Sequence, residues 1–292
     1  METLNTIWIF LKPVLLNTAF QFLAIFGIFF FFGIILYLLA RFTRVVFVKS
    51  IGYKFDVFVT GWLGTPVHEL GHALLCLPFG HQITELKLYT PSSEDGTLGY
   101  VKHSYNTKNI WHQIGNFFIG MGPILFGSFV LFLLIKYMLP DNVALLKMVN
   151  SQGADFTTWH GFLNQFVQLY HAGIQFPALL FTYTNFHSWQ FWLFLYISLS
   201  IASHMELSPP DLKGVWAGLL AIILLLFVIN CIGQAFHFSV SGYMTNISRY
   251  TNFSAGIFSF ATILSLLFFV SSWVLLNIYT LLRFQKPFHP FA

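Results

Sequence analysis

The sequence predicts a mainly α-helical protein that crosses a membrane several times as a helical bundle. Of its 292 residues, 57% are hydrophobic and only 8% are charged, whereas soluble domains carry about 25% charged residues. A soluble chain of this length cannot bury so much apolar side chain, because too much of any small fold lies at its surface. Several apolar runs also reach the length of about 20 residues that a helix needs to cross the hydrocarbon core. The lipid bilayer is therefore the expected surrounding of the chain.

About six membrane spans are predicted by the length and hydropathy of the apolar runs. They lie near residues 15–40, 57–80, 116–139, 188–205, 214–236 and 255–282. The first run is too long for the apolar part of a cleavable signal peptide, so we expect a membrane helix there. The second run is the least apolar of the six because it holds two histidines and a glutamate. Ionisable residues within a membrane span indicate a functional site.

The basic residues give an incomplete view of the orientation. Four of them follow the first span and favour a cytoplasmic loop there: Arg41, Arg44, Lys49 and Lys54. Arg283 and Lys286 also favour a cytoplasmic position, but six passes in all, with the first loop cytoplasmic, would not place both regions on the same side of the membrane. A re-entrant segment, or a seventh pass within 172–187, would remove the conflict, so the orientation stays open. An integral, multi-pass protein of the cell (inner) membrane is expected.

A small β-hairpin is predicted between the second and third spans. Residues 82–89 largely alternate polar and apolar side chains, as a half-buried strand does. Residues 91–96 supply turn chemistry, and 97–103 follow as a second, less regular strand. The hairpin is either a solvated surface element or an edge that offers backbone partners to an extended substrate.

One domain over residues 1–292 is the simplest organisation, since no internal repeat or low-complexity linker is present. Residues 156–175 carry aromatic and apolar side chains at helical spacing, which fits an interfacial amphipathic helix or a packing helix. The net charge is +4 and the isoelectric point about 9.0. A nucleic-acid partner is not expected, because the sequence has no basic, aromatic-laced binding stripe.

A metal site is indicated by the run from His68 to His72 in the second span. His68 and His72 are four residues apart, so on a helix both imidazoles lie on one face and can bind one ion. Glu69 projects beside them and can accept the proton of a water on that ion. This His-Glu-x-x-His arrangement is typical of zinc hydrolases, in which zinc takes three protein ligands and a water.

A third ligand is sought among the few acidic residues. Apart from Glu69, only Glu206 and Asp211 lie where two apolar segments meet. Pro209 and Pro210 interrupt the helix there, and unwound backbone at membrane depth is tolerated where it is buried or lines a wet cavity. His204 is another candidate ligand, or a donor to the oxyanion of the tetrahedral intermediate. Asp211 alternatively caps the next helix, a role that Ser208 also suits.

The chain resembles the site-2 proteases, which are intramembrane zinc metalloproteases, over about residues 57–215. The resemblance rests on the His-Glu-x-x-His run, on the Gly122-Pro123 pair that looks like the start of the family's next core helix, and on a Pro-containing break with a late Asp211. It implies His68, His72 and Asp211 as zinc ligands and Glu69 as general base. It also implies cleavage within a substrate's membrane helix after partial unwinding. The chain differs from the family's Leu-Asp-Gly, with Pro210 and Leu212 flanking the aspartate.

Three hypotheses for function follow. The first is a zinc-dependent intramembrane endopeptidase whose partner is a membrane protein, expected to be a single-pass helix. The second is a membrane zincin of another lineage, with Glu206 or His204 as third ligand, that cuts at the membrane surface. The third is a transporter or assembly factor that uses the polar cluster without catalysis.

Overall fold

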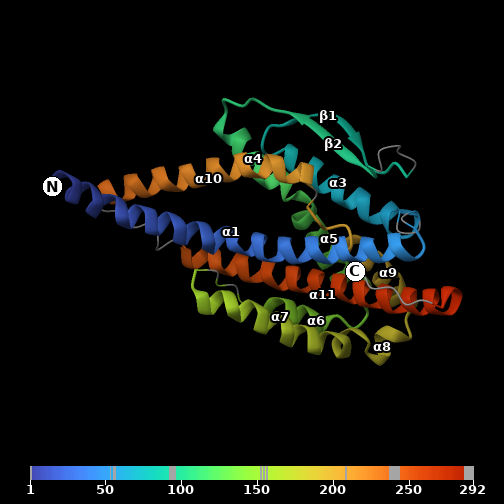
Figure 1. Cartoon of the computed structure of the whole chain (residues 1–292). Helices are drawn as coiled ribbons and strands as arrows, with labels where there is room; N and C mark the ends of the chain where they lie inside the picture. The colour runs from blue at the N-terminus through green and yellow to red at the C-terminus, as the bar shows by residue number, and fades with distance from the viewer. Residues whose placement is uncertain are drawn as a thin grey trace.

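The computed structural model describes residues 2–52, 54, 57–91, 97–151, 153, 155, 157–207, 209–236 and 244–285. Within these ranges the chain is mostly helical, and its only sheet is a two-stranded hairpin. Figure 1 shows an elongated bundle of long helices with the hairpin on one side. The predicted fold class, a mainly helical bundle with a small hairpin, is confirmed to this extent.

Three long helices form the frame of the bundle. They are α1 (Glu2–Ser50), α10 (Pro209–Ala235) and α11 (Met244–Phe284), and α1 packs against both of the others (Figure 1). Phenylalanine rings pack between two of them: the ring centroids of Phe29 of α1 and Phe258 of α11 lie 5.7 Å apart, with an angle of 59° between the ring planes. Such ring pairs stabilise beyond the area that they bury.

The outer face of α10 carries a stripe of exposed apolar side chains. Trp216, Leu220, Leu224 and Val228 follow one another at a spacing of four residues, and each is at least half exposed. In water this stripe would form a large apolar patch of the kind that soluble monomers avoid. A lipid-facing surface accounts for it.

The predicted count of about six spans is not confirmed. Among the described residues, three stretches are long and apolar enough to cross a bilayer: Asn5–Ser50, Asp211–Ala235 and Thr251–Phe284. A fourth arises if α4 (Ile110–Gly120) and α5 (Gly122–Met138) are taken as one span, but these two helices meet at a bend of 55°. The bend falls where Pro123 opens α5, a position at which proline's missing N–H costs no helical hydrogen bond.

Two of the predicted spans are shorter than expected. The run at 57–80 is a π-helical turn, η1 (Val57–Gly61), followed by α3 (Trp62–Cys76), which has 15 residues. The run at 188–205 is α9 (Trp189–Ala202), with 14 residues. At 1.5 Å per residue, α3 without its π-helical turn reaches about 22 Å and α9 about 21 Å, both less than the hydrocarbon thickness of about 30 Å.

Three shorter helices lie beside α11 and α9. They are α6 (Val143–Ser151), α7 (Trp159–Leu180) and α8 (Tyr183–Phe186); α6 and α7 contact α11 directly, while α8 packs on α9. The amphipathic helix predicted at 156–175 is confirmed as a helix by α7. That α7 lies at the membrane surface stays a prediction, because its side-chain pattern alone also fits a packing helix.

The predicted hairpin is present. Strand β1 (Gln82–Lys87) pairs antiparallel with β2 (Tyr100–Ser104), with Ile83 opposite His103 and Leu86 opposite Val101. The hairpin lies against α3, so it covers the helix that carries the histidine pair (Figure 1). Three earlier predictions concern positions outside the described residues: the turn at 92–96, the Ser208 cap and the Lys286 charge.

Acid sensitivity of the hairpin is expected from Glu85. Its carboxylate accepts a hydrogen bond from Lys102 Nζ at 2.8 Å and another from the Tyr100 hydroxyl, and these partners lower its pKa from 4.5 to about 2. A carboxyl group whose pKa falls on folding stabilises the fold above its ordinary pKa, and loses this contribution as the pH drops towards the lowered value. Hydrogen exchange of the β1 amides, corrected for the intrinsic rate, should therefore speed up between about pH 4.5 and about pH 2. Glu85→Gln should remove this acid-dependent change, and an unchanged profile in that variant would contradict the assignment.

Candidate metal centre

Helix α3 is held in place by close backbone contacts at two glycines. A Cβ atom on Gly64 would lie 2.3 Å from the Ser200 carbonyl oxygen of α9, and one on Gly71 would lie 2.5 Å from the Gly122 carbonyl oxygen of α5. Only glycine permits such an approach between helices. Gly71 therefore lets the backbone of α5 pack against α3 between the two histidines. The two contacts fix the face of α3 on which His68, Glu69 and His72 lie.

Gly71→Ala is expected to destabilise the protein by about 1–3 kcal/mol or more, because the added methyl group meets backbone atoms that cannot turn away. The thermal midpoint in detergent should fall. Gly173→Ala is the matched control, since a Cβ there meets no atom within 4 Å. That variant should be neutral or slightly more stable, as alanine is the better helix former. Equal melting temperatures for the two variants would contradict the packing argument.

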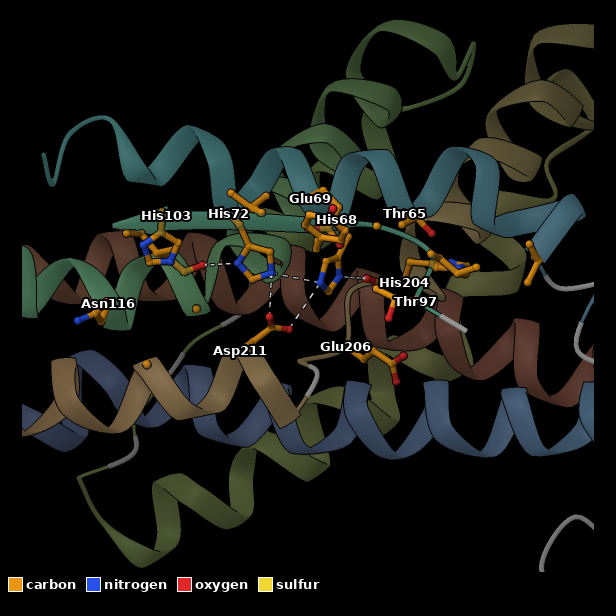
Figure 2. Close-up of a pocket in the computed structure, with 18 of the residues that line it drawn as sticks. Thr65, His68, Glu69, His72, Thr97, His103, Asn116, His204, Glu206 and Asp211 are labelled. Carbon is orange, nitrogen blue, oxygen red and sulfur yellow. Dashed lines mark hydrogen bonds and ion pairs between the residues drawn. The ribbon is translucent and has the colours of Figure 1, made fainter. Parts of the chain in front are cut away.

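Asp211 reaches the two histidines from the first turn of α10. Its Oδ1 lies 3.2 Å from His72 Nε2, and its Oδ2 lies 3.6 Å from His68 Nε2. The two Nε2 atoms are 3.2 Å apart. Figure 2 shows the carboxylate beneath the two imidazoles, joined to both by dashed lines. The three residues therefore form a group whose ligand atoms all lie within 4.8 Å of one another.

The tautomers of both histidines follow from their other ring nitrogen. His68 Nδ1 is 2.7 Å from the His204 carbonyl oxygen, and His72 Nδ1 is 2.7 Å from the Ile119 carbonyl oxygen. A carbonyl oxygen only accepts, so each Nδ1 carries a proton and donates it. In the neutral ring each Nε2 then presents a lone pair towards the other and towards Asp211. This is the orientation in which metal-binding histidines are usually held.

The donor set fits a zinc ion. Two imidazole nitrogens and a carboxylate oxygen are ligands typical of catalytic zinc. With metal–ligand bonds of about 2.0–2.1 Å, tetrahedral coordination separates neighbouring ligand atoms by about 3.3 Å. The separations of 3.2, 3.2 and 3.6 Å are close to that value. A cation also removes the mutual repulsion of three acceptors that have no proton between them.

The other two candidate ligands are engaged elsewhere. The Glu206 carboxylate forms an ion pair with Arg44 of α1, and the His204 Nδ1 atom lies 3.1 Å from the Ser200 carbonyl oxygen. Neither side chain belongs to the group of potential metal ligands found among the described residues. His204 contributes its backbone carbonyl instead, by orienting His68. Its side chain lines the cavity around the three residues, so a role towards an oxyanion stays a prediction.

A cavity of about 600 Å³ surrounds the three residues. Glu69 lines it while only 7% exposed, and the segment 97–101 leading into β2 forms part of its wall. A Cβ on Gly99 would lie 2.8 Å from Glu69 Cγ, so the hairpin backbone closes directly over the glutamate. Ligand sites in proteins commonly occupy about 300–1,000 Å³. This cavity has room for a short stretch of peptide.

Several lining residues carry no signal in the sequence. His103 enters the cavity wall from β2, where its Nδ1 lies 2.9 Å from His81 Nδ1, and the other His81 nitrogen donates to the His112 carbonyl oxygen at 2.8 Å. Burial lowers the pKa of both His81 and His103 below 6.5 and favours their neutral forms. The pair joins positions 22 residues apart. The contact between His81 and His103 could have been predicted only from the register of the two strands, and the sequence pattern does not give that register.

The described part of the chain defines a class: a helical protein with three or four helices able to span a membrane, and a largely buried group of two histidines and one aspartate able to hold a metal ion. No protein-family model, curated protein or solved structure matches the chain.

Proposed function

We propose that the chain is a zinc-dependent intramembrane endopeptidase, similar in its chemistry to the site-2 proteases, that acts as one domain over residues 1–292. The observation that carries the proposal is the convergence of three acceptor atoms, from His68, His72 and Asp211, beside the buried carboxylate of Glu69. Carboxylate, paired imidazoles and a cavity in this combination are the components of a metallopeptidase site.

His68 Nε2, His72 Nε2 and a carboxylate oxygen of Asp211 are the atoms that would hold the ion. A bound zinc ion supplies Lewis-acid chemistry: it lowers the pKa of a water molecule to about 7 and polarises a carbonyl group. The carbonyl oxygens of Ile119 and His204 keep the two imidazoles in the binding tautomer.

Glu69 acts as the general base. Its carboxylate lies next in sequence to His68 and lines the same cavity, outside the ligand group. It takes a proton from the attacking water and returns it to the amine nitrogen that leaves when the peptide bond breaks. Its burial beneath Gly99 keeps bulk water from competing for that proton.

The substrate proposed is a membrane-protein segment, most simply a single-pass helix, that unwinds before it is cut. The cavity lies among apolar helices, and an exposed apolar stripe on α10 supports a bilayer around them. Beside the cavity, the edge of β2 that pairs with no other described strand offers backbone groups to an extended chain, as in strand addition. A multi-pass location in the cell (inner) membrane belongs to the same proposal.

The geometry favours Asp211 over the alternative ligands, because its carboxylate reaches both histidines, whereas Glu206 pairs with Arg44 and the His204 side chain is outside the group of ligand atoms. A surface-cutting zincin of another lineage would need one of these side chains at the metal. In a non-enzymatic protein, the Glu69 carboxylate would transfer no proton, and its replacement by an amide would not affect function. Cleavage of a membrane-helix substrate by zinc-loaded wild type, and its loss in Glu69→Gln, tests the proposal against both.

A further inference from the structure

Two buried polar groups without a hydrogen-bond partner line the same cavity. They are the Thr65 hydroxyl oxygen Oγ1 and the Asn116 amide nitrogen Nδ2, in residues that are 5% and 4% exposed. Buried polar atoms in folded proteins are nearly always paired, and each exception calls for an explanation. The other buried atoms of this kind among the described residues belong to side chains outside the cavity lining.

The two groups lie on opposite sides of the metal ligands. Thr65 is on α3, one turn before His68, and His72 follows one turn after it. Asn116 is on α4, one turn before Ile119, whose carbonyl oxygen holds His72. Figure 2 shows the order Thr65, His68, His72, Asn116 across the site. A chain lying along the cavity would therefore pass one group, the metal ligands and then the other.

The chemistry of these groups limits what they can bind. An amide nitrogen only donates, so the partner of Asn116 Nδ2 must be an acceptor. The apolar side chains of a membrane segment carry no acceptor, which leaves the main-chain carbonyl oxygens. In an intact helix these carbonyls accept from N–H groups four residues on, whereas an unwound segment has them available.

We infer that Thr65 Oγ1 and Asn116 Nδ2 each donate a hydrogen bond to a main-chain carbonyl oxygen of an unwound substrate, on the two sides of the bond that is cut. The inference rests on the proposed function and deepens it. The site binds the main chain of an extended peptide. It therefore selects segments that unwind easily rather than segments with particular side chains. Both are positioning residues, and they take no part in the proton transfers.

The test measures binding to zinc-loaded protein in detergent, without turnover. One probe is the phosphinic peptide acetyl-Leu-Leu-ψ(PO2CH2)-Leu-Leu-amide, which has main-chain carbonyls on both sides of a metal-binding group; the other is dimethylphosphinate, which has none. Thr65→Val and Asn116→Leu should each weaken the phosphinic peptide about 3- to 10-fold, the usual contribution of one hydrogen bond. Dimethylphosphinate should bind all variants equally, and Thr65→Ser should restore the peptide's affinity.

A matched control is Thr262→Val on α11, which removes another buried, unpartnered hydroxyl outside the cavity lining. It should leave both affinities unchanged. Wild-type affinity for the phosphinic peptide in Thr65→Val and Asn116→Leu would overturn the inference, as would an equal loss for both probes, which marks damage at the metal. Failure of the zinc-loaded wild type to bind either probe would instead overturn the proposed function. If Asn116→Leu does not fold, the comparison of Thr65→Val with Thr65→Ser tests the inference on its own.

Discussion

Replacement of Glu69 by glutamine is expected to lower peptide-bond cleavage by about 10²- to 10⁴-fold, the usual contribution of a general base, while zinc stays bound. The amide has the size of the carboxylate and keeps the contact with Gly99, so the cavity is preserved. What it loses is the ability to accept a proton from water. Because Glu69 is outside the ligand group, the metal content should match that of the wild type.

The measurement is cleavage of a single-pass membrane substrate in detergent or vesicles, with zinc determined on the same preparation. Glu85→Gln is the control, since it makes the same chemical change on the hairpin outside the cavity lining and should cleave at close to the wild-type rate. Undiminished cleavage by Glu69→Gln would refute the assigned role. Loss of zinc together with cleavage would show that Glu69 supports the metal rather than the proton transfer.

Asp211→Ala is expected to weaken zinc binding by at least about 100-fold. This exceeds the loss usually seen when a residue that only hydrogen-bonds to a metal ligand is removed. The variant removes the only carboxylate in the ligand group and leaves two imidazoles, too few for a stable catalytic zinc site. Purified protein should fall from about one zinc per chain to a small fraction, with activity lost in parallel.

Glu206→Ala and His204→Ala distinguish the assigned ligand from the alternatives. Both should retain zinc, because Glu206 is paired with Arg44, and the His204 contact with His68 is made by the backbone carbonyl, which alanine keeps. Metal that is lost on either substitution, and kept in Asp211→Ala, would favour a zincin of another lineage.

The sequence predicted the parts of the site that depend on local spacing. His68, Glu69 and His72 share a helix, so the i, i+4 rule alone placed the two imidazoles together. Asp211 was one of several possible third ligands, because its approach depends on how α10 packs against α4, and periodicity does not encode that packing. Elimination narrowed the choice, and the distances then separated Asp211 from Glu206 and His204.

The remaining features arise from contacts between distant segments. The carbonyl oxygens of Ile119 and His204 that orient the histidines belong to the backbone, so no residue type marks them in the sequence. Thr65 and Asn116 read as ordinary helix residues until their lack of partners is visible. The count of about six spans is not confirmed, because hydropathy does not report where a helix bends or stops.

The most direct test of the central claim is an anomalous diffraction map, recorded at the zinc absorption edge, of protein purified with zinc. We predict one strong peak among His68 Nε2, His72 Nε2 and the Asp211 carboxylate, about 2.0–2.2 Å from each ligand atom. A map without a peak at this position, or with the metal bound by Glu206 or the His204 side chain, would contradict the account.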